Sequence, residues 1–176
     1  MSKPLLLIDV DGPLNPFAAK PTRRPDGYDT HRLRPAGWED RPLRVWLNPK
    51  HGAMLLGLTD VVDLVWATTW GHDANLMIGP LIGLPELPVI EVGRPSWMDG
   101  PHIFKLEPVA KYVGSRAFAW FDDAFEKADL EWARQRDAEG KPTLFLRINP
   151  AVGIVQDDVD RVAQWARSLV DRGETQ

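Results

Sequence analysis

The sequence contains no cysteine in 176 residues, and that absence excludes several kinds of chemistry. Disulfide frameworks, thiol nucleophiles and zinc sites built on cysteine are all ruled out. The chain also has no apolar run that approaches the roughly 20 residues that a membrane-spanning helix requires. The short apolar run near the N-terminus meets Asp9 and Asp11 at once, which is not the pattern of a secretion signal. We therefore expect a cytoplasmic protein that has no membrane partner.

The rest of the composition is that of an ordinary globular chain with one uneven feature. Hydrophobic residues make up 44% of the sequence and charged residues 26%, enough to bury a core and keep a polar surface. The net charge of −4 is mild, but residues 12–47 hold seven basic and four acidic residues. We expect these residues to form a proline-rich basic flap, inserted into a single domain over residues 1–176.

Strand and helix signals alternate along the chain. Short apolar runs typical of buried strands occupy residues 5–8, 61–68, 88–92, 117–121 and 143–148. Helical patterns with capping or stop residues occupy residues 48–58, 72–82, 105–113, 126–138 and 157–170. The flap is expected to contain only a short hairpin ending at residues 43–47. The alternation predicts an α/β fold, a Rossmann-like three-layer sandwich around a mostly parallel five-stranded sheet.

Polar side chains directly follow three of the predicted strands. They are Asp9, Asp11, Thr68, Thr69, Asp122 and Asp123. Ligands of open parallel sheets bind beyond the carboxyl ends of the strands, so these side chains are expected at one edge. Carboxylates that converge there repel one another unless a cation lies among them. Oxygen ligands of this kind suit a hard divalent ion such as Mg²⁺.

These residues resemble the four motifs of the haloacid dehalogenase (HAD) superfamily. In chain order they are the strand-borne DxDG at residues 9–12, a threonine after the second strand, a lysine opening a helix, and a strand-terminal Asp-Asp. The segments DVDGPLNPF, RVWLNPKHG, LVWATTWGHDAN and AWFDDAF are similar to the HAD-like domain of Swiss Army Knife RNA repair proteins. The resemblance covers residues 5–148 and implies a HAD-like fold whose cap is minimal, the flap alone.

The resemblance implies catalytic roles for four residues. Asp9 would be the nucleophile that forms an aspartyl-phosphate, and Asp11 the general acid and base. Thr68 would bind a phosphoryl oxygen, and Lys105 would neutralise charge on the nucleophile and the transferring group. Lys111 is the alternative to Lys105, which is preferred because it opens its helix nearer the strand ends.

The resemblance also implies a metal site that holds Mg²⁺. Asp9 would contribute its carboxylate and Asp11 its backbone carbonyl. Asp122 and Asp123 would complete the site, and the sequence leaves open which of the two ligates the metal directly.

Further substrate contacts are expected from Gly12, Thr69 and Trp70. Gly12 allows the backbone to turn sharply, whereas the following Pro13 removes one N–H that could bind phosphate. Thr69 is the alternative to Thr68, because one residue decides which face of the sheet a side chain occupies. Tryptophans in or beside predicted loops either stack on bases or pack in the core, and they are Trp38, Trp46, Trp70 and Trp97.

The sequence therefore predicts a Mg²⁺-dependent HAD-type phosphatase, a phosphoric monoester hydrolase. The expected substrate is a phosphorylated nucleic-acid end or nucleotide, as in RNA repair, because the basic flap is too short to enclose the site and favours a polyanion. The alternative is a catalytically weak or inactive HAD-like module that binds phosphate or nucleic acid. A dehalogenase is disfavoured by Asp11, since that reaction needs no acid to protonate an alkoxide.

Overall fold

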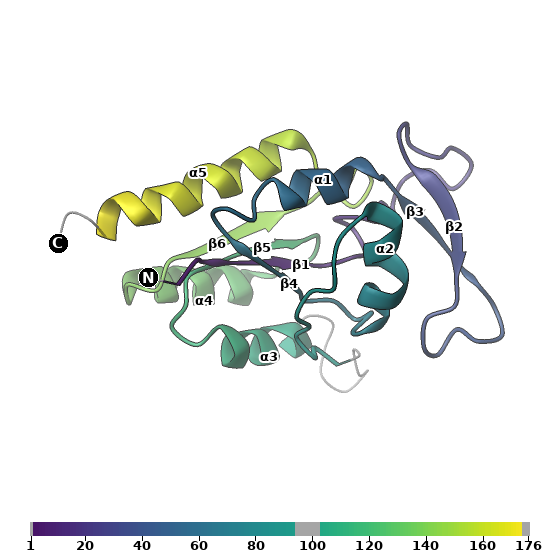
Figure 1. The fold of residues 1–176 in the computed structure, drawn as a ribbon. Helices are drawn as coiled ribbons and strands as arrows, with labels where there is room; N and C mark the ends of the chain where they lie inside the picture. The colour runs from purple at the N-terminus through teal and green to yellow at the C-terminus, as the bar shows by residue number, and fades with distance from the viewer. Residues whose placement is uncertain (1, 94–102, 174–176) are drawn as a thin grey trace.

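The central element of the fold is a four-stranded parallel sheet in the order β4-β1-β5-β6 (Figure 1). In the computed structural model, which describes residues 2–93 and 103–173, its strands are β1 (Leu5–Ile8), β4 (Asp63–Trp66), β5 (Phe118–Asp122) and β6 (Thr143–Arg147). Strand β1 pairs with β4 on one side and with β5 on the other. This central place accounts for its continuous apolar sequence, because both faces of the strand are covered.

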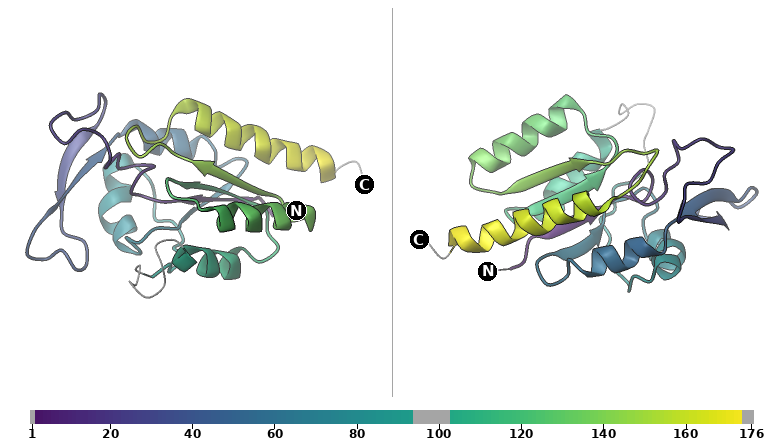
Figure 2. Two further views of the ribbon diagram at one scale, coloured as in Figure 1. Left: turned by 180° about the vertical axis from the view of Figure 1, so that it is seen from behind. Right: turned by 90° about the horizontal axis from the view of Figure 1, so that it is seen from above.

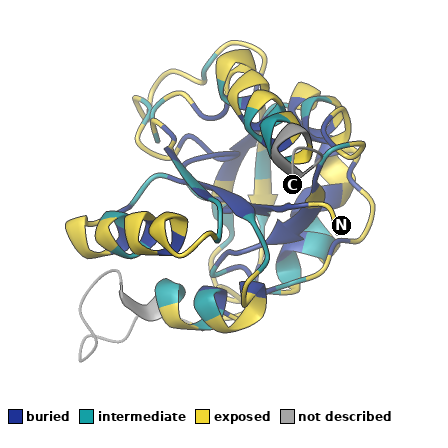
Figure 3. Ribbon diagram, turned by 90° about the vertical axis from the view of Figure 1, so that its left-hand side faces the viewer, coloured by how far each residue is buried: buried dark blue, intermediate teal, exposed yellow. Residues whose placement is uncertain are grey.

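Alternate side chains of β1 supply two separate hydrophobic cores. Leu6 and Ile8 belong to the core under helices α1 (Lys50–Leu56) and α5 (Gln156–Gly173). Leu5 and Leu7 belong to the core on the opposite face, under α3 (Ile103–Val113) and α4 (Lys127–Ala138). Figures 1 and 2 show these helix pairs on the two faces of the sheet, and Figure 3 shows the strands buried between them. The predicted three layers are therefore present.

The helices that cover the sheet are amphipathic rather than apolar throughout. The strongest case is α5, whose buried residues Val159, Val162 and Ala166 recur at helical spacing on the side that faces the sheet. No helix in the described part of the chain has the length and apolar character needed to cross a membrane.

Residues 88–92 do not form the fifth strand that was expected. Only Val89 makes a parallel bridge, to Trp66 at the outer edge of β4. The Trp66 N–H donates to the carbonyl of Pro88 at 2.9 Å, and Ile90 N–H donates back to the Trp66 carbonyl at 2.8 Å. The next ladder bond toward the start of β4 would need an N–H on Pro88, which proline lacks. The described sheet therefore has four strands.

The helix expected over residues 72–82 is also irregular. It consists of a π-helical turn, η1 (Ala74–Ile78), followed by the short helix α2 (Gly79–Ile82). Pro80 stands inside this segment, where its missing N–H and its ring interrupt regular α-helical hydrogen bonding. The segment ends as expected at Gly83, whose φ of 79° is left-handed.

The flap, residues 12–47, contains the expected hairpin, which ends at residues 43–47. Strands β2 (Asp29–Leu33) and β3 (Leu43–Leu47) pair antiparallel as a second, two-stranded sheet (Figure 1). The loop after β6 anchors the flap, because Tyr28 Oη donates to the carbonyl of Val152 at 2.7 Å. Ala18 N–H donates to the carbonyl of Pro150 in the same loop at 3.0 Å.

His51 lies at the junction of the flap, α1 and the loop after β6. Its ring is 2% exposed and meets the Tyr28 ring edge-on, with ring centres 5.5 Å apart. Nε2 lies 3.1 Å from the carbonyl oxygen of Ile154, and because a carbonyl only accepts, Nε2 carries the proton. Nδ1 is buried without a partner among the described residues. Burial lowers the pKa of His51 to about 4, although the hydrogen bond to Ile154 opposes this shift.

Replacing His51 by glutamine should make the fold less sensitive to acid. Between pH 6.5 and about 4 the unfolded chain binds a proton that folded His51 does not, so stability falls as the pH falls through this window. Across this pH window the free energy of unfolding of the wild type should fall by about 3 kcal/mol more than that of His51→Gln. Urea unfolding of both proteins at pH 7 and pH 4 measures the difference, and equal acid losses would contradict the assignment.

Candidate functional site

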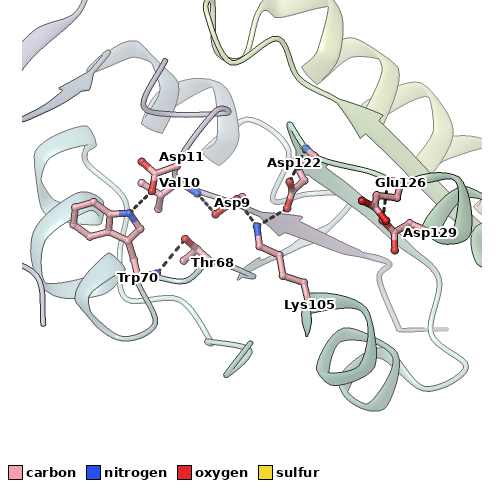
Figure 4. A network of polar contacts seen from close by, with 10 residues as sticks. Asp9, Val10, Asp11, Thr68, Trp70, Lys105, Asp122, Glu126 and Asp129 are labelled. Atoms are coloured by element: carbon pink, nitrogen blue, oxygen red, sulfur yellow. Dashed lines mark hydrogen bonds and ion pairs between the residues drawn. The ribbon is translucent and has the colours of Figure 1, made fainter. Parts of the chain in front are cut away.

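The candidate site begins at Asp9, the first residue beyond β1. Its backbone N–H donates to the carbonyl of Phe121 in β5 at 3.0 Å, which keeps this residue in line with the sheet. The side chain is 6% exposed. One carboxylate oxygen, Oδ1, accepts the Val10 N–H at 2.8 Å, and the other, Oδ2, lies 2.5 Å from Lys105 Nζ (Figure 4). The carboxylate is therefore fixed and paired.

Lys105 joins the ends of β1 and β5 by contacting a carboxylate on each. Its Nζ lies 2.8 Å from Asp122 Oδ2 as well as near Asp9, and Asp122 Oδ1 accepts the Ala124 N–H at 3.0 Å. Burial lowers the pKa of Lys105, but the charges of Asp9 and Asp122 outweigh burial and hold that pKa above its usual range. Burial, reinforced by the charge of Asp9, raises the pKa of Asp122 despite its contact with Lys105.

Three carboxylates at this edge could hold a cation together. Asp9, Asp122 and Asp123 each offer one oxygen, and these oxygens lie within 4.8 Å of one another. Burial and the charge of Asp9 also raise the pKa of Asp123. Within the described chain, Lys105 supplies the positive charge in contact with this group, which leaves an excess of negative charge. Closely spaced carboxylate oxygens with an unmet negative charge fit Mg²⁺.

Gly12 allows the loop after β1 to approach the loop after β5 closely. Its φ is 94°, a conformation that residues with a Cβ rarely adopt. A Cβ built at this position would lie 2.7 Å from the Cβ of Asp123. The Gly12 N–H donates to the carbonyl of Asn15 at 2.9 Å and closes the turn. Glycine is therefore required here by conformation and by space.

Asp11 lies on the other side of Asp9 from Lys105, with both carboxylate oxygens hydrogen-bonded (Figure 4). Oδ1 accepts from Asn15 Nδ2 at 2.7 Å, and Oδ2 accepts from the indole N–H of Trp70 at 2.9 Å. Its carboxylate is not part of the three-carboxylate group. Burial and the charge of Asp9 raise the pKa of Asp11 against the lowering effect of these hydrogen bonds. An oriented carboxyl with a raised pKa can donate a proton and later accept one.

Asn15 is the site residue that sequence reasoning missed. Its Oδ1 accepts the backbone N–H of Trp46 in β3 at 3.1 Å, while its Nδ2 holds Asp11. Asn15 therefore connects the flap to the carboxyl group of Asp11. The only local signal was an asparagine four residues after Asp11 in a turn sequence, which by itself indicates a turn rather than a site.

The loop after β4 contributes a buried hydroxyl. Ala67 N–H donates to the carbonyl of Ile8 at 2.9 Å, which extends the β1–β4 register into this loop. Thr68 is fully buried, and its Oγ1 accepts the Trp70 N–H at 3.3 Å, so its own hydrogen is available to donate. Thr69 is partly exposed and lines a cavity between the flap and the loop after β4.

The remaining sequence candidates lie in different places. Lys111 is exposed near the end of α3, and Trp46 is buried in β3. Trp97 lies outside the described residues. Comparison with protein families and with curated proteins finds no family model and no individual protein that matches this chain.

Replacing Lys105 by methionine should destabilise the fold in the absence of divalent cations. The change leaves Asp9 and Asp122 buried without their positive partner, which costs about 3 kcal/mol at pH 7. The cost should shrink as the pH falls, because the raised pKa of Asp122 lets this carboxylate take up a proton, and it should shrink when Mg²⁺ is added.

Urea unfolding in EDTA and then in Mg²⁺ measures these effects. Lys111→Met is the matched control, because Lys111 is exposed on the same helix. Equal losses of stability in the two variants would show that Lys105 does not compensate the carboxylates.

Proposed function

We propose that this protein is a Mg²⁺-dependent phosphohydrolase that cleaves phosphoric monoesters through an aspartyl-phosphate. The observation that carries the proposal is the arrangement around Asp9. This buried carboxylate contacts Lys105 on one side, within reach of Asp122 and Asp123, and has the oriented carboxyl of Asp11 on the other side. The arrangement supplies a nucleophile, a charge-neutralising group and a proton donor at one sheet edge. The motif resemblance to the HAD superfamily points to the same chemistry.

The first step transfers the phosphoryl group to the protein. A carboxylate oxygen of Asp9 attacks phosphorus, and the bond between phosphorus and the ester oxygen breaks. Protonated Asp11 gives its proton to that departing oxygen, so the leaving group departs as a neutral alcohol. The raised pKa of Asp11 favours the protonated form that this step requires.

The second step restores the protein by hydrolysis. Asp11, now a carboxylate, takes a proton from water while the water oxygen attacks the phosphorus of the aspartyl-phosphate. The bond between phosphorus and Asp9 breaks and inorganic phosphate is released. Both hydrogen bonds to Asp11 persist through this cycle, so Asn15 and Trp70 hold the carboxyl in place for each transfer.

Charge control comes from Lys105, Thr68 and the three carboxylates. Lys105 reduces the repulsion between the Asp9 carboxylate and an incoming phosphate, and Thr68 offers a hydroxyl hydrogen to a phosphoryl oxygen. Asp9, Asp122 and Asp123 are the residues that would hold Mg²⁺. The ion, when bound, supplies positive charge that offsets the negative charge of the phosphoryl group.

Asp9→Asn should abolish hydrolysis of p-nitrophenyl phosphate while the fold is kept. Without the nucleophile, kcat should fall on the order of 10³-fold or more. The assay is run with Mg²⁺ and with EDTA, and circular dichroism checks that the variant is folded. Turnover retained by Asp9→Asn would defeat the proposal. Salt-sensitive RNA binding by a wild type that hydrolyses nothing would favour the binding module instead.

Asp11→Asn should separate substrates by the quality of their leaving group. An alkyl ester such as ribose 5-phosphate needs a proton on its departing oxygen, whereas p-nitrophenolate leaves without one. The loss in kcat/KM should therefore be about 10-fold or more greater for the alkyl ester. Equal losses for the two substrates would show that Asp11 is not the acid.

A further inference from the structure

A cavity of about 650 Å³ lies next to the site and has no part in the chemistry described so far. It opens between the flap and the loop after β4. Its lining includes Asp11, Phe17, Trp38, Arg44, Trp70 and Asp73. Its volume is within the range of about 300–1,000 Å³ typical of small-molecule sites.

The cavity lies where the leaving group of the proposed reaction must go. Asp11 and Trp70 lie on one side of Asp9, and Lys105 lies on the other (Figure 4). Because Asp11 protonates the ester oxygen, the group attached to that oxygen extends away from Asp9 past Asp11. Asp11 and Trp70 also line the cavity, so it receives this group directly.

Two aromatic side chains, Phe17 and Trp38, line the flap side of the cavity and are exposed. Phe17 is 51% exposed and Trp38 is 47% exposed, although large aromatic side chains ordinarily gain by burial. Exposed aromatic faces are the surfaces on which nucleobases stack, and such stacking accepts any base.

The loop that carries Trp38 is held in place over the cavity. Trp38 N–H donates to the carbonyl of Pro35 at 2.9 Å and closes the turn. Ala36 N–H donates to Asp73 Oδ2 at 2.7 Å, which ties the loop to the segment after β4. These two hydrogen bonds fix the backbone of the loop that carries the Trp38 ring before a ligand binds.

The charges of the cavity disfavour a second anionic group. Asp73 contributes a carboxylate to the lining, and Asp11 contributes the carboxyl group that is protonated when substrate binds in the proposed reaction. Arg44 is the cation there, and it is already engaged, with its guanidinium 4.1 Å from the ring centre of Trp46 and Nη1 donating to the carbonyl of Pro21 at 2.9 Å. A neutral, flat, polar group fits this lining better than a further phosphate does.

We infer that the cavity binds the nucleoside of a nucleoside monophosphate, with the base stacked at Trp38 and Phe17 and the phosphate at Asp9. The inference rests on the proposed function and narrows its substrate class. The nucleoside monophosphate unit occurs free or at the end of an oligonucleotide, and both sources present the same base and phosphate to the site.

The test compares kcat/KM for adenosine 5′-monophosphate and for ribose 5-phosphate, which carries the same phosphate without a base. The wild type should prefer the nucleotide about 10-fold or more. Trp38→Ala should lower this preference about 10-fold, and Trp38→Phe, which keeps an aromatic ring, should retain most of it. An oligoadenylate with a 5′-phosphate is the third substrate. A higher kcat/KM for the oligoadenylate than for the free nucleotide identifies oligonucleotide ends as the source, and a lower one identifies the free nucleotide.

Tyr112→Ala is the matched control for removal of an exposed aromatic ring. Tyr112 is 45% exposed and lies beside Leu5 and Asp63, at the opposite end of the strands from Asp9. This variant should leave the preference for the nucleotide unchanged. A loss as large as that of Trp38→Ala would overturn the inference.

The experiment separates failure of the inference from failure of the proposed function. Mg²⁺-dependent hydrolysis of both substrates without preference would overturn the nucleoside site and leave the phosphohydrolase standing. If neither substrate is hydrolysed, the proposed phosphohydrolase activity is wrong. Calorimetric binding of the same two ligands then decides the inference. Tighter binding of the nucleotide that is lost in Trp38→Ala supports the nucleoside site, and equal binding overturns it.

Discussion

The contact of Lys105 with Asp9 and Asp122 is the interaction on which the site depends. It exists because β1 and β5 pair in parallel with Ile8 opposite Phe121. The residue that follows each of these two is an aspartate, so the two carboxylates lie side by side where Lys105 contacts both. A shift of one residue in this register would send one of the two carboxylates to the other face of the sheet. The hydrophobic cores on the two faces fix that register, because β1 contributes alternate side chains to each core. Packing on the two faces of the sheet therefore sets the separation of Asp9 and Asp122.

The elements around this contact could be predicted from the sequence because their patterns are local. The apolar run at residues 5–8 became β1 with the same bounds, and the helix opened by Lys105 was found as α3. The prediction was wrong where local pattern and long-range pairing disagree. Residues 88–92 have the composition of a strand, but Pro88 cannot continue the ladder. The hairpin ending at residues 43–47 was expected, but the bounds of its first strand, β2, were not predicted, because its sequence, DTHRL, is polar and its residues are exposed or half-buried.

The hydrogen bonds around Asp11 could not be predicted, because their donors converge only in the folded chain. Trp70 was expected only to contact substrate, and the structure adds a hydrogen bond from its indole N–H to Asp11, 59 residues away in the sequence. Asn15 is near in sequence, yet its role depends on Trp46, a flap residue 31 positions further on. The flap thus does more than cover the site, because β3 supports the asparagine that orients Asp11. Displacement of β3 would weaken both the cavity wall and the hold on the proposed acid.

The balance of charge at the sheet edge links stability to ligand binding. Lys105 contacts two buried carboxylates, and Asp123 adds a third nearby, so the folded chain carries the electrostatic cost of this excess negative charge. Burial, reinforced by the charge of Asp9, raises the pKa of Asp122 and of Asp123, which shows that negative charge is costly at this edge. A cation that binds the folded chain and not the unfolded chain stabilises the folded state by mass action. The stabilisation grows with the logarithm of the cation concentration once that concentration exceeds the Kd. In the proposed phosphohydrolase, the repulsion that destabilises the folded chain without a cation would supply the affinity for Mg²⁺, and the ion would in turn allow the negatively charged phosphate to approach Asp9.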